Sequence, residues 1–312
     1  MRVLFWGTPE FATPPLRALL GEGYEVVGVV TQPDKPQGRS RSTLVPSPVK
    51  VIALEEGLPV LQPERPRGEE FEGALRALAP DISVVVAYGH ILPQSVIDLP
   101  PLGTLNIHAS LLPRWRGAAP IQAAILAGDD ETGVSIMRMV RRMDAGPVIL
   151  QAPTPILGDE TYGELQLRLS ELGALAIVEA LTLIAMGAAQ EDAQDEVLAT
   201  YAGKVEREHT LVNWTGDARQ VARQIRAYDP RPGAYTTLRG VDVKLSGVRL
   251  APDAEGDPGL VLAIDEGGML VACRTGGVRV AYVQPAGKRR LAALDWAQGR
   301  GVAAGDILGA AE

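Results

Sequence analysis

Short apolar stretches alternate with amphipathic stretches along the first 190 residues. The apolar stretches, which are too short for helices, predict strands at 3–6, 25–31, 58–61, 82–87, 104–110, 133–139 and 148–151. The stretches between them predict helices at 11–20, 50–56, 69–78, 118–127 and 164–186. Strands and helices in this order form an open, mostly parallel sheet with helices on both faces, the Rossmann-like α/β class.

The pattern changes in the last third of the chain. A helix is predicted at 217–228, followed by short strands at 234–237, 241–245, 259–265, 269–273 and 278–283. Short strands separated by turns at this spacing favour a small β-barrel. We therefore expect a first domain over residues 1–189, a linker over 190–208 and a second domain over 209–312.

Composition is that of a globular protein large enough for two domains, with 312 residues, 46% of them hydrophobic and 22% charged. The longest apolar run, 174–189, includes Glu179 and is shorter than the roughly 20 residues of a membrane span. The first residues lead directly into a strand, without the features of a signal peptide. We expect a cytoplasmic monomer that contacts no membrane.

Charge is distributed unevenly. The formal net charge is -8, but residues 1–208 carry -10 and residues 209–312 carry +2. Because binding of nucleic acid depends on the local surface rather than on the total, the basic balance of the last third leaves a nucleic-acid partner open.

Several kinds of cofactor site are not predicted. The three histidines, His90, His108 and His209, are far apart in the sequence, and Cys273 is the only cysteine. We therefore expect neither a metal site nor an internal disulfide. The first strand is followed by Gly7-Thr-Pro-Glu-Phe-Ala, which lacks the Gly-x-Gly-x-x-Gly pattern of dinucleotide-binding folds.

The stretch 104–117 combines a strand pattern with polar side chains. Leu105 and Ile107 alternate with Asn106 and His108, so the amide and the imidazole lie on one face, about 6–7 Å apart. A lone strand histidine is more often a buried structural residue. Here a polar pair is followed by Ser110 and a Pro/Gly-rich turn, which is typical of a ligand-binding strand end in an open α/β sheet.

Motifs along nearly the whole chain carry a family resemblance. They are GTPEFA at 7–12, TQPD at 31–34, PSPVK at 46–50, VVVAYG at 84–89, SLLPRWRGAAP at 110–120, MDAG at 143–146 and QPAGK at 284–288, besides Asn106 and His108. With these motifs the chain resembles the formyltransferases that use 10-formyltetrahydrofolate, and most closely those members that act on methionyl-tRNA.

The resemblance implies three catalytic residues: Asn106, His108 and Asp144. Alone, an Asp before Ala-Gly-Pro is more often a simple turn residue; the resemblance adds Asp144 to the pair that the alternation had joined. It also implies that the pteridine ring of 10-formyltetrahydrofolate, the co-substrate, binds near Tyr88, Gly89, Ile91, Leu92, Ser110, Leu111, Leu112 and Pro113. The Leu112-Pro113 peptide bond is expected to be cis.

Two further regions are implied to contact the acceptor, initiator methionyl-tRNA. The Pro-, Ser- and Arg-rich segment 32–48 predicts a functional loop, and the resemblance places either Arg39 or Arg41 against the acceptor stem. The second domain is implied to be an OB-like barrel that contacts tRNA, with Lys288 and Arg289 among its basic residues.

Three functions remain open from the residues. The first is formyl transfer to methionyl-tRNA, in which Asn106 and protonated His108 hold the oxyanion and Asp144 supports the imidazolium. The second is formyl transfer to a small amine, such as glycinamide ribonucleotide or an amino-sugar nucleotide, which would need no tRNA-contacting loop. The third is a non-catalytic RNA-binding protein, which would have no use for the three catalytic residues.

Overall fold

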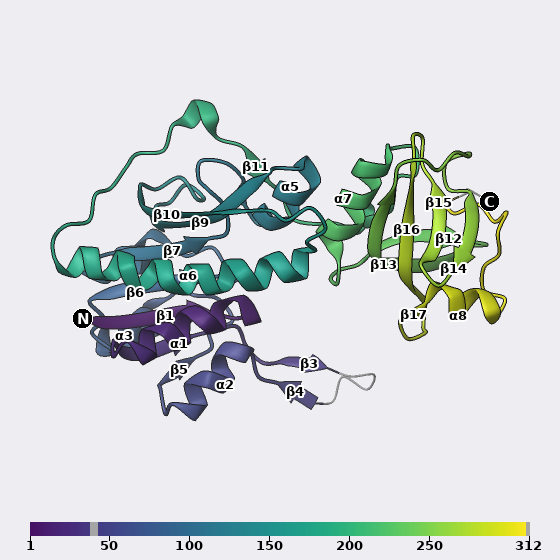
Figure 1. The fold of residues 1–312 in the computed structure, drawn as a ribbon. Coiled ribbons are helices and arrows are strands. Elements are labelled where there is room, and N and C mark those ends of the chain that lie inside the picture. Colours follow the sequence, from purple (N-terminus) through teal and green to yellow (C-terminus); the bar gives the residue numbers. More distant parts are fainter. Residues whose placement is uncertain (38–42, 310–312) are drawn as a thin grey trace. The chain divides into compact units, whose positions relative to one another are not determined.

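The computed structural model describes residues 1–37 and 43–309, which form two compact units (Figure 1). The first unit comprises Met1–Gly117, Glu131–Thr154 and Gln166–Tyr201, and the second comprises Ala118–Asp130, Pro155–Leu165 and Ala202–Glu312. The predicted domain limits at 189 and 208 stay predictions. Two short segments before residue 166 group with the second unit by their contacts, which no local sequence pattern indicates.

A seven-stranded sheet forms the centre of the first unit. Its spatial order is β10 (Val148–Pro155), β9 (Glu131–Arg138), β7 (Thr104–His108), β6 (Ile82–Val86), β1 (Arg2–Gly7), β2 (Glu25–Val30) and β5 (Val60–Leu61). The pairs from β7 to β5 are parallel, whereas β9 runs antiparallel to β7. The predicted mostly parallel sheet is confirmed.

Helices cover this sheet. They are α1 (Thr13–Gly21), α2 (Pro48–Glu55), α3 (Glu69–Ala77), the short α4 (Gln94–Ile97) and α6 (Tyr162–Ala185). The long α6 packs closely on β7 and β9, because a Cβ at Gly173 would meet the Ile107 and Val134 side chains at 3.0 and 3.7 Å. Helix α2 begins where the Ser47 hydroxyl accepts a hydrogen bond from the Lys50 amide. Among the described residues, no helix is long and apolar enough to cross a membrane.

The segment 32–48 contains structure that the sequence did not predict. Strands β3 (Lys35–Gln37) and β4 (Thr43–Val45) pair as an antiparallel hairpin, with Pro36 opposite Leu44. The second strand contains Thr43 and Val45, whose β-branched side chains favour extended backbone. The loop predicted over 32–48 therefore contains two short strands, and its functional role stays a prediction.

The second unit contains an antiparallel sheet with the order β12 (Ala234–Leu238), β13 (Val241–Ala251), β16 (Gly277–Pro285), β15 (Gly268–Ala272) and β14 (Val261–Asp265). A short strand, β17 (Leu291–Ala292), pairs with β16, and two helices pack with the sheet, α7 (Ala218–Tyr228) and α8 (Ala293–Gln298). All five predicted strands are confirmed. That the sheet closes as an OB-like barrel stays a prediction.

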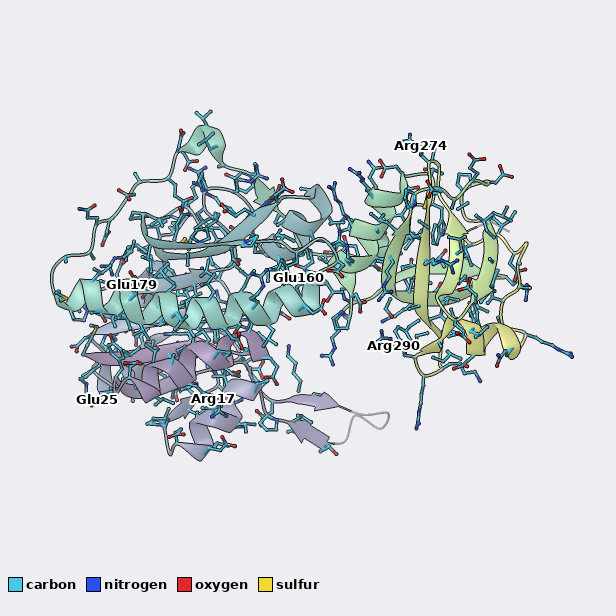
Figure 2. The ribbon with its side chains drawn as sticks, viewed as in Figure 1. Arg17, Glu25, Glu160, Glu179, Arg274 and Arg290 are labelled. Atoms are coloured by element: carbon cyan, nitrogen blue, oxygen red, sulfur yellow. The ribbon has the colours of Figure 1, made fainter. Side chains whose placement is uncertain are left out.

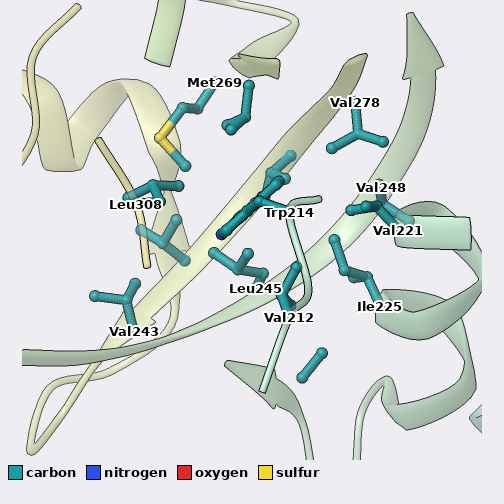
Figure 3. Packing of buried hydrophobic residues seen from close by; sticks show 14 of the residues in the cluster. Val212, Trp214, Val221, Ile225, Val243, Leu245, Val248, Met269, Val278 and Leu308 are labelled. Carbon is teal, nitrogen blue, oxygen red and sulfur yellow. The ribbon is translucent and has the colours of Figure 1, made fainter. Parts of the chain in front are cut away.

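Trp214 lies within the core of the second unit (Figure 3). It is 5% exposed, and its indole nitrogen donates a hydrogen bond to the Thr236 hydroxyl at 2.9 Å, so the polar edge of the ring is satisfied. Residues of α7, among them Val221 and Ile225, pack into the same cluster. Helix α5 (Pro120–Ala127) lies against α7 and belongs to this unit.

Candidate active site

Two neighbouring strands bring the predicted site residues to one edge of the sheet. Strand β6 pairs in parallel with β7, with Val85 opposite Asn106, so the loops that follow the two strands leave side by side. His108, the last residue of β7, is 5% exposed, and Asn106 is partly exposed. The alternation of β7 places both side chains on one face, as predicted.

Asp144 meets His108 although 35 residues separate them. Because β9 is antiparallel to β7, the loop after β9 starts beside Thr104, with the Met139 amide bonded to the Thr104 carbonyl, and it must turn back toward His108. Asp144 Oδ2 lies 3.7 Å from His108 Nδ1. The structure therefore brings two of the three predicted catalytic residues into direct electrostatic contact.

The imidazole of His108 is held from both sides. Its Nε2 lies 2.9 Å from the Trp115 carbonyl oxygen. A carbonyl oxygen can only accept, so Nε2 carries a hydrogen and donates it. On the other side of the ring, Asp144 Oδ2 faces Nδ1 at 3.7 Å. Both ring nitrogens therefore face acceptor oxygens.

Asn106 differs from its neighbours because its side-chain amide makes no hydrogen bond to any described residue. Since the side chain is partly exposed, its amide N–H groups can donate to a ligand without breaking an existing bond. This is the property that a hydrogen-bond donor to an oxyanion requires.

The turn after β7 is held from within. The buried Ser110 donates a hydrogen bond to the Arg114 carbonyl at 2.6 Å. Ser135 donates to the Ser110 carbonyl at 2.7 Å and accepts from the Leu112 amide at 3.0 Å. The Leu112-Pro113 bond is cis, as expected. Ser135, which had not been singled out in the sequence, therefore holds the turn from β9.

The loop after β6 divides the residues predicted to bind folate. Tyr88 and Leu92 are buried, whereas Gly89 and Ile91 are exposed, Ile91 by 78%. The Tyr88 ring packs edge-on against Trp6 at 5.2 Å. Burial raises the pKa of the Tyr88 hydroxyl to about 12, and this hydroxyl has no hydrogen-bond partner among the described residues. Of these four predicted residues, only Gly89 and Ile91 are therefore open to solvent.

A polar cluster at the base of the β3–β4 hairpin was missed in the sequence. Lys50 Nζ binds Asp34 Oδ2 at 2.6 Å and Gln62 Oε1 at 2.7 Å, and Gln62 Nε2 binds Asp34 Oδ1 at 2.7 Å. Hydrogen bonds from Lys50 and then from Gln62 hold the pKa of the Asp34 carboxyl below its usual value. Gln32 continues the cluster by donating to the Tyr88 carbonyl at 3.2 Å.

The predicted tRNA-contacting residues lie in different places. Arg39 and Arg41 fall outside the described residues. Lys288 and Arg289 are exposed in the turn after β16, and the adjacent Arg290 stacks over the Tyr282 ring at 4.2 Å (Figure 2). In the described part of the chain no group of His, Cys, Asp and Glu residues could hold a metal ion.

Family models match both parts of the chain. Residues 1–181 match the formyl transferase model, and residues 204–301 match that of the formyl transferase C-terminal domain. The chain belongs to the formyl transferase family. The resemblance that the sequence motifs carried is therefore confirmed.

Relatives match over the full length. The chain is 46% identical to a methionyl-tRNA formyltransferase of Pseudomonas paraeruginosa, covering 99% of this chain and 100% of the relative. It is 49% identical to a methionyl-tRNA formyltransferase of Aromatoleum aromaticum, covering 100% of this chain and 98% of the relative.

Solved structures share the fold at lower identity. HypX from Aquifex aeolicus in complex with tetrahydrofolic acid matches with a TM-score of 0.66 and 21% identity over 95% of this chain. This chain spans about half of HypX, 46% of its length. An N-formyltransferase from Helicobacter canadensis, in complex with folinic acid and dTDP-3-aminofucose, matches with a TM-score of 0.68 and 16% identity over 93% of this chain and 99% of that one.

Proposed function

We propose that the protein transfers the formyl group of 10-formyltetrahydrofolate to the α-amine of initiator methionyl-tRNA. The observation that carries the proposal is end-to-end similarity, at 46–49% identity, to proteins named methionyl-tRNA formyltransferase. The contact between His108 and Asp144, together with an Asn106 amide that bonds to no described residue, supplies groups that such a reaction requires. The product is N-formylmethionyl-tRNA, which serves translation initiation.

The segments around the site fit a folate. Ile91 follows β6, and Met143 precedes Asp144; the two side chains are 78% and 55% exposed. Apolar side chains left open beside polar catalytic groups are typical of a pocket for an aromatic ligand. Residues 88–92 and 110–113 are the proposed pteridine-binding segments. Ser110 and Leu112 would act there by shaping the turn, because both side chains are buried.

The chemistry needs little activation of the nucleophile. An α-amine titrates near pKa 8, so a neutral amine is available to attack the formyl carbon. As it attacks, the formyl oxygen gains negative charge, which the Asn106 amide and the His108 imidazolium stabilise. The folate nitrogen leaves as its bond to carbon breaks and it gains a proton. Asp144 supports the charge on His108 and helps to move protons, in part through water.

The acceptor is the part of the proposal that the fold alone does not decide, since formyl transfer to a small amine would use the same three residues. We propose that the β3–β4 hairpin, with Arg39 or Arg41, and the turn carrying Lys288 and Arg289 contact the tRNA.

The assay is transfer from 10-formyltetrahydrofolate to purified methionyl-tRNA, with the product identified by mass. We expect N-formylmethionyl-tRNA only when donor and aminoacylated tRNA are both present. No product under these conditions would refute the proposal. A control with uncharged tRNA distinguishes formylation of the α-amine from formylation of the nucleic acid.

A further inference from the structure

The loop that carries Asp144 is held by a segment from outside the sheet. Residues 190–201, called the strap here, come after α6 in the chain. The backbones of Asp192 and Val148 bond to each other in both directions at 2.9 Å, and Arg138 binds Glu191 at 2.8 Å. The Trp115 amide donates to the Thr200 hydroxyl at 2.9 Å. The strap therefore contacts both β10 and the turn after β7.

Gln194 is the strap residue that reaches the Asp144 loop. Its Nε2 donates to the carbonyl oxygens of Asp144 and Gly146 at 2.8 and 2.7 Å, and its Oε1 accepts from Arg116 Nε at 2.9 Å. Both N–H donors and the oxygen of the amide thus bind groups that surround the site. The amide of a glutamine on the surface would be satisfied by water instead.

Arg116 anchors the other side of this arrangement. Its side chain is 1% exposed, and its two terminal nitrogens bind the two oxygens of Glu196 at 3.2 and 3.0 Å. Hydrogen bonds from Arg116 and then Arg142 lower the pKa of the Glu196 carboxyl. A buried guanidinium without partners would destabilise the fold. The two hydrogen bonds to Glu196 therefore hold the strap against Arg116, next to Gly117.

The Asp144 loop needs such support. Asp144 has a φ of 50°, a left-handed conformation that is strained for a non-glycine residue. Gly146 packs against the preceding strand, where an added Cβ would lie 1.8 Å from the Arg138 carbonyl oxygen. On the other side, the Gly117 amide donates to Asp144 Oδ2 at 2.8 Å. Gln194 fixes the loop backbone, and Gly117 fixes the carboxylate.

We infer that Gln194 is a positioning residue, which sets Asp144 against His108 through the backbone of the Asp144 loop. Arg116 and Glu196 hold Gln194 in place. The inference rests on the proposed role of Asp144 in formyl transfer. A displacement of about 1 Å in such a group can reduce turnover about 100-fold.

Two substitutions separate this role from simple packing. Gln194→Met keeps the shape and removes every hydrogen bond. Gln194→Glu keeps the acceptor for Arg116 but places a carboxylate oxygen against two carbonyl oxygens, so the bond to the Asp144 loop is lost. Gln190→Met, in an exposed position of the same strap, is the control.

We expect kcat for formyl transfer to fall about 10- to 100-fold in both Gln194 variants, with KM for tRNA and for folate within about twofold of wild type. The kcat of Gln194→Glu, divided by that of wild type, should rise as the pH falls from about 7.5 to 5.5. The introduced carboxyl, once protonated, would regain one hydrogen-bond donor to the Asp144 loop. The same ratio for Gln194→Met should stay flat. A purely structural role would not produce this pH difference.

Other results would overturn the inference. Wild-type kcat in both variants, or in Gln194→Glu alone, would show that the bonds to Asp144 and Gly146 do not matter for turnover. A rise in KM with unchanged kcat would assign Gln194 to binding. Asp144→Asn is measured in parallel: near-normal transfer in that variant would refute the proposed role of Asp144 itself, whereas a defect there with normal Gln194 variants would refute only the positioning.

Discussion

At the scale of single residues, the site is a strand histidine whose two ring nitrogens both have partners. The Trp115 carbonyl oxygen accepts a hydrogen bond from Nε2, and the Asp144 carboxylate lies 3.7 Å from Nδ1. A buried neutral imidazole has one donor nitrogen and one acceptor nitrogen, so it needs only one acceptor partner. The second one, supplied by a loop that must turn back from β9, favours a catalytic interpretation.

His108→Ala and Asp144→Asn should each reduce transfer about 10²- to 10⁴-fold, the usual contribution of a positioned proton-transfer group. Because the two residues act together, the double variant should lose little more than the worse single variant. Rates are measured under single turnover, with His209→Ala, an exposed histidine of the second unit, as the control. Effects that multiply in the double variant would contradict a joint action.

Much of the residue-level site could be predicted because it is local. The alternation of β7 alone placed Asn106 and His108 on one face. Asp144 could not be joined to them by any local pattern, since its approach depends on the return of a loop after an antiparallel strand. Only the family resemblance pointed to it. Gln194 and Glu196 could not be predicted either, because in the sequence they belong to an acidic stretch with no apolar periodicity.

At the scale of elements, the polar cluster of Asp34, Lys50 and Gln62 lies at the base of the β3–β4 hairpin. Lys50 and Asp34 are 19% and 22% exposed and 2.6 Å apart, so their charges are only partly screened by water. Through Gln62 and Gln32 this cluster extends to the Tyr88 carbonyl, at the start of a proposed folate-binding loop. The hairpin and that loop therefore share one set of hydrogen bonds.

Lys50→Met should lower the free energy of unfolding by about 1–3 kcal/mol, because it leaves the Asp34 carboxylate without its charged partner. Arg17→Met is the control: the Arg17–Glu55 pair is 3.7 Å apart and more than half exposed, and Arg17 lies on the surface (Figure 2), so its loss should cost less than about 1 kcal/mol. Urea unfolding followed by circular dichroism measures both. Equal losses in the two variants would contradict a special role for the cluster.

The same pair should give a pH dependence. The folded-state pKa of Asp34 is held below its usual 3.8. The stabilisation is therefore complete above about pH 4 and is lost as the pH falls through the lowered pKa. The difference between wild type and Lys50→Met should shrink on acidification. A difference that grew toward acid pH would contradict the sign of this shift.

Most helices and strands could be predicted from the pattern of apolar residues. The elements that were not predicted share a physical cause. The hairpin, α4 and α8 are short elements whose stability comes from contacts with distant residues rather than from their own periodicity. Lys50 illustrates this: in the sequence it is an ordinary polar position near the start of a helix. In the structure its partners, Asp34 and Gln62, come from segments on either side of that helix.

At the scale of the whole molecule, an acidic protein is proposed to bind a polyanion. Residues 209–312 carry the basic balance, and within them the exposed Lys288 and Arg289 lie in one turn beside Arg290, at the opposite end of the second unit from Arg274 (Figure 2). Binding through such residues releases counterions from the tRNA, and its affinity then depends on salt.

Arg289→Glu should weaken binding of methionyl-tRNA and reduce the slope of log affinity against log salt by about 0.7–0.9, the value expected for one lost phosphate contact. Arg274→Glu makes the same change in charge elsewhere and should leave the slope unchanged. Folate affinity should respond to neither substitution. An equal effect of the two would indicate that only net charge matters, and no effect of Arg289→Glu would remove this turn from the proposed tRNA contacts.

The acceptor is identified by letting methionyl-tRNA and small amines compete for a limiting amount of 10-formyltetrahydrofolate. Methionyl-tRNA is mixed with glycinamide ribonucleotide and an amino-sugar nucleotide, and the ratio of formylated products gives the ratio of kcat/KM values. We expect almost all of the formyl group on methionyl-tRNA, with the total falling about 10²- to 10⁴-fold in His108→Ala. Formylation of a small amine at an equal or higher rate, or a product yield that His108→Ala leaves unchanged, would contradict the account.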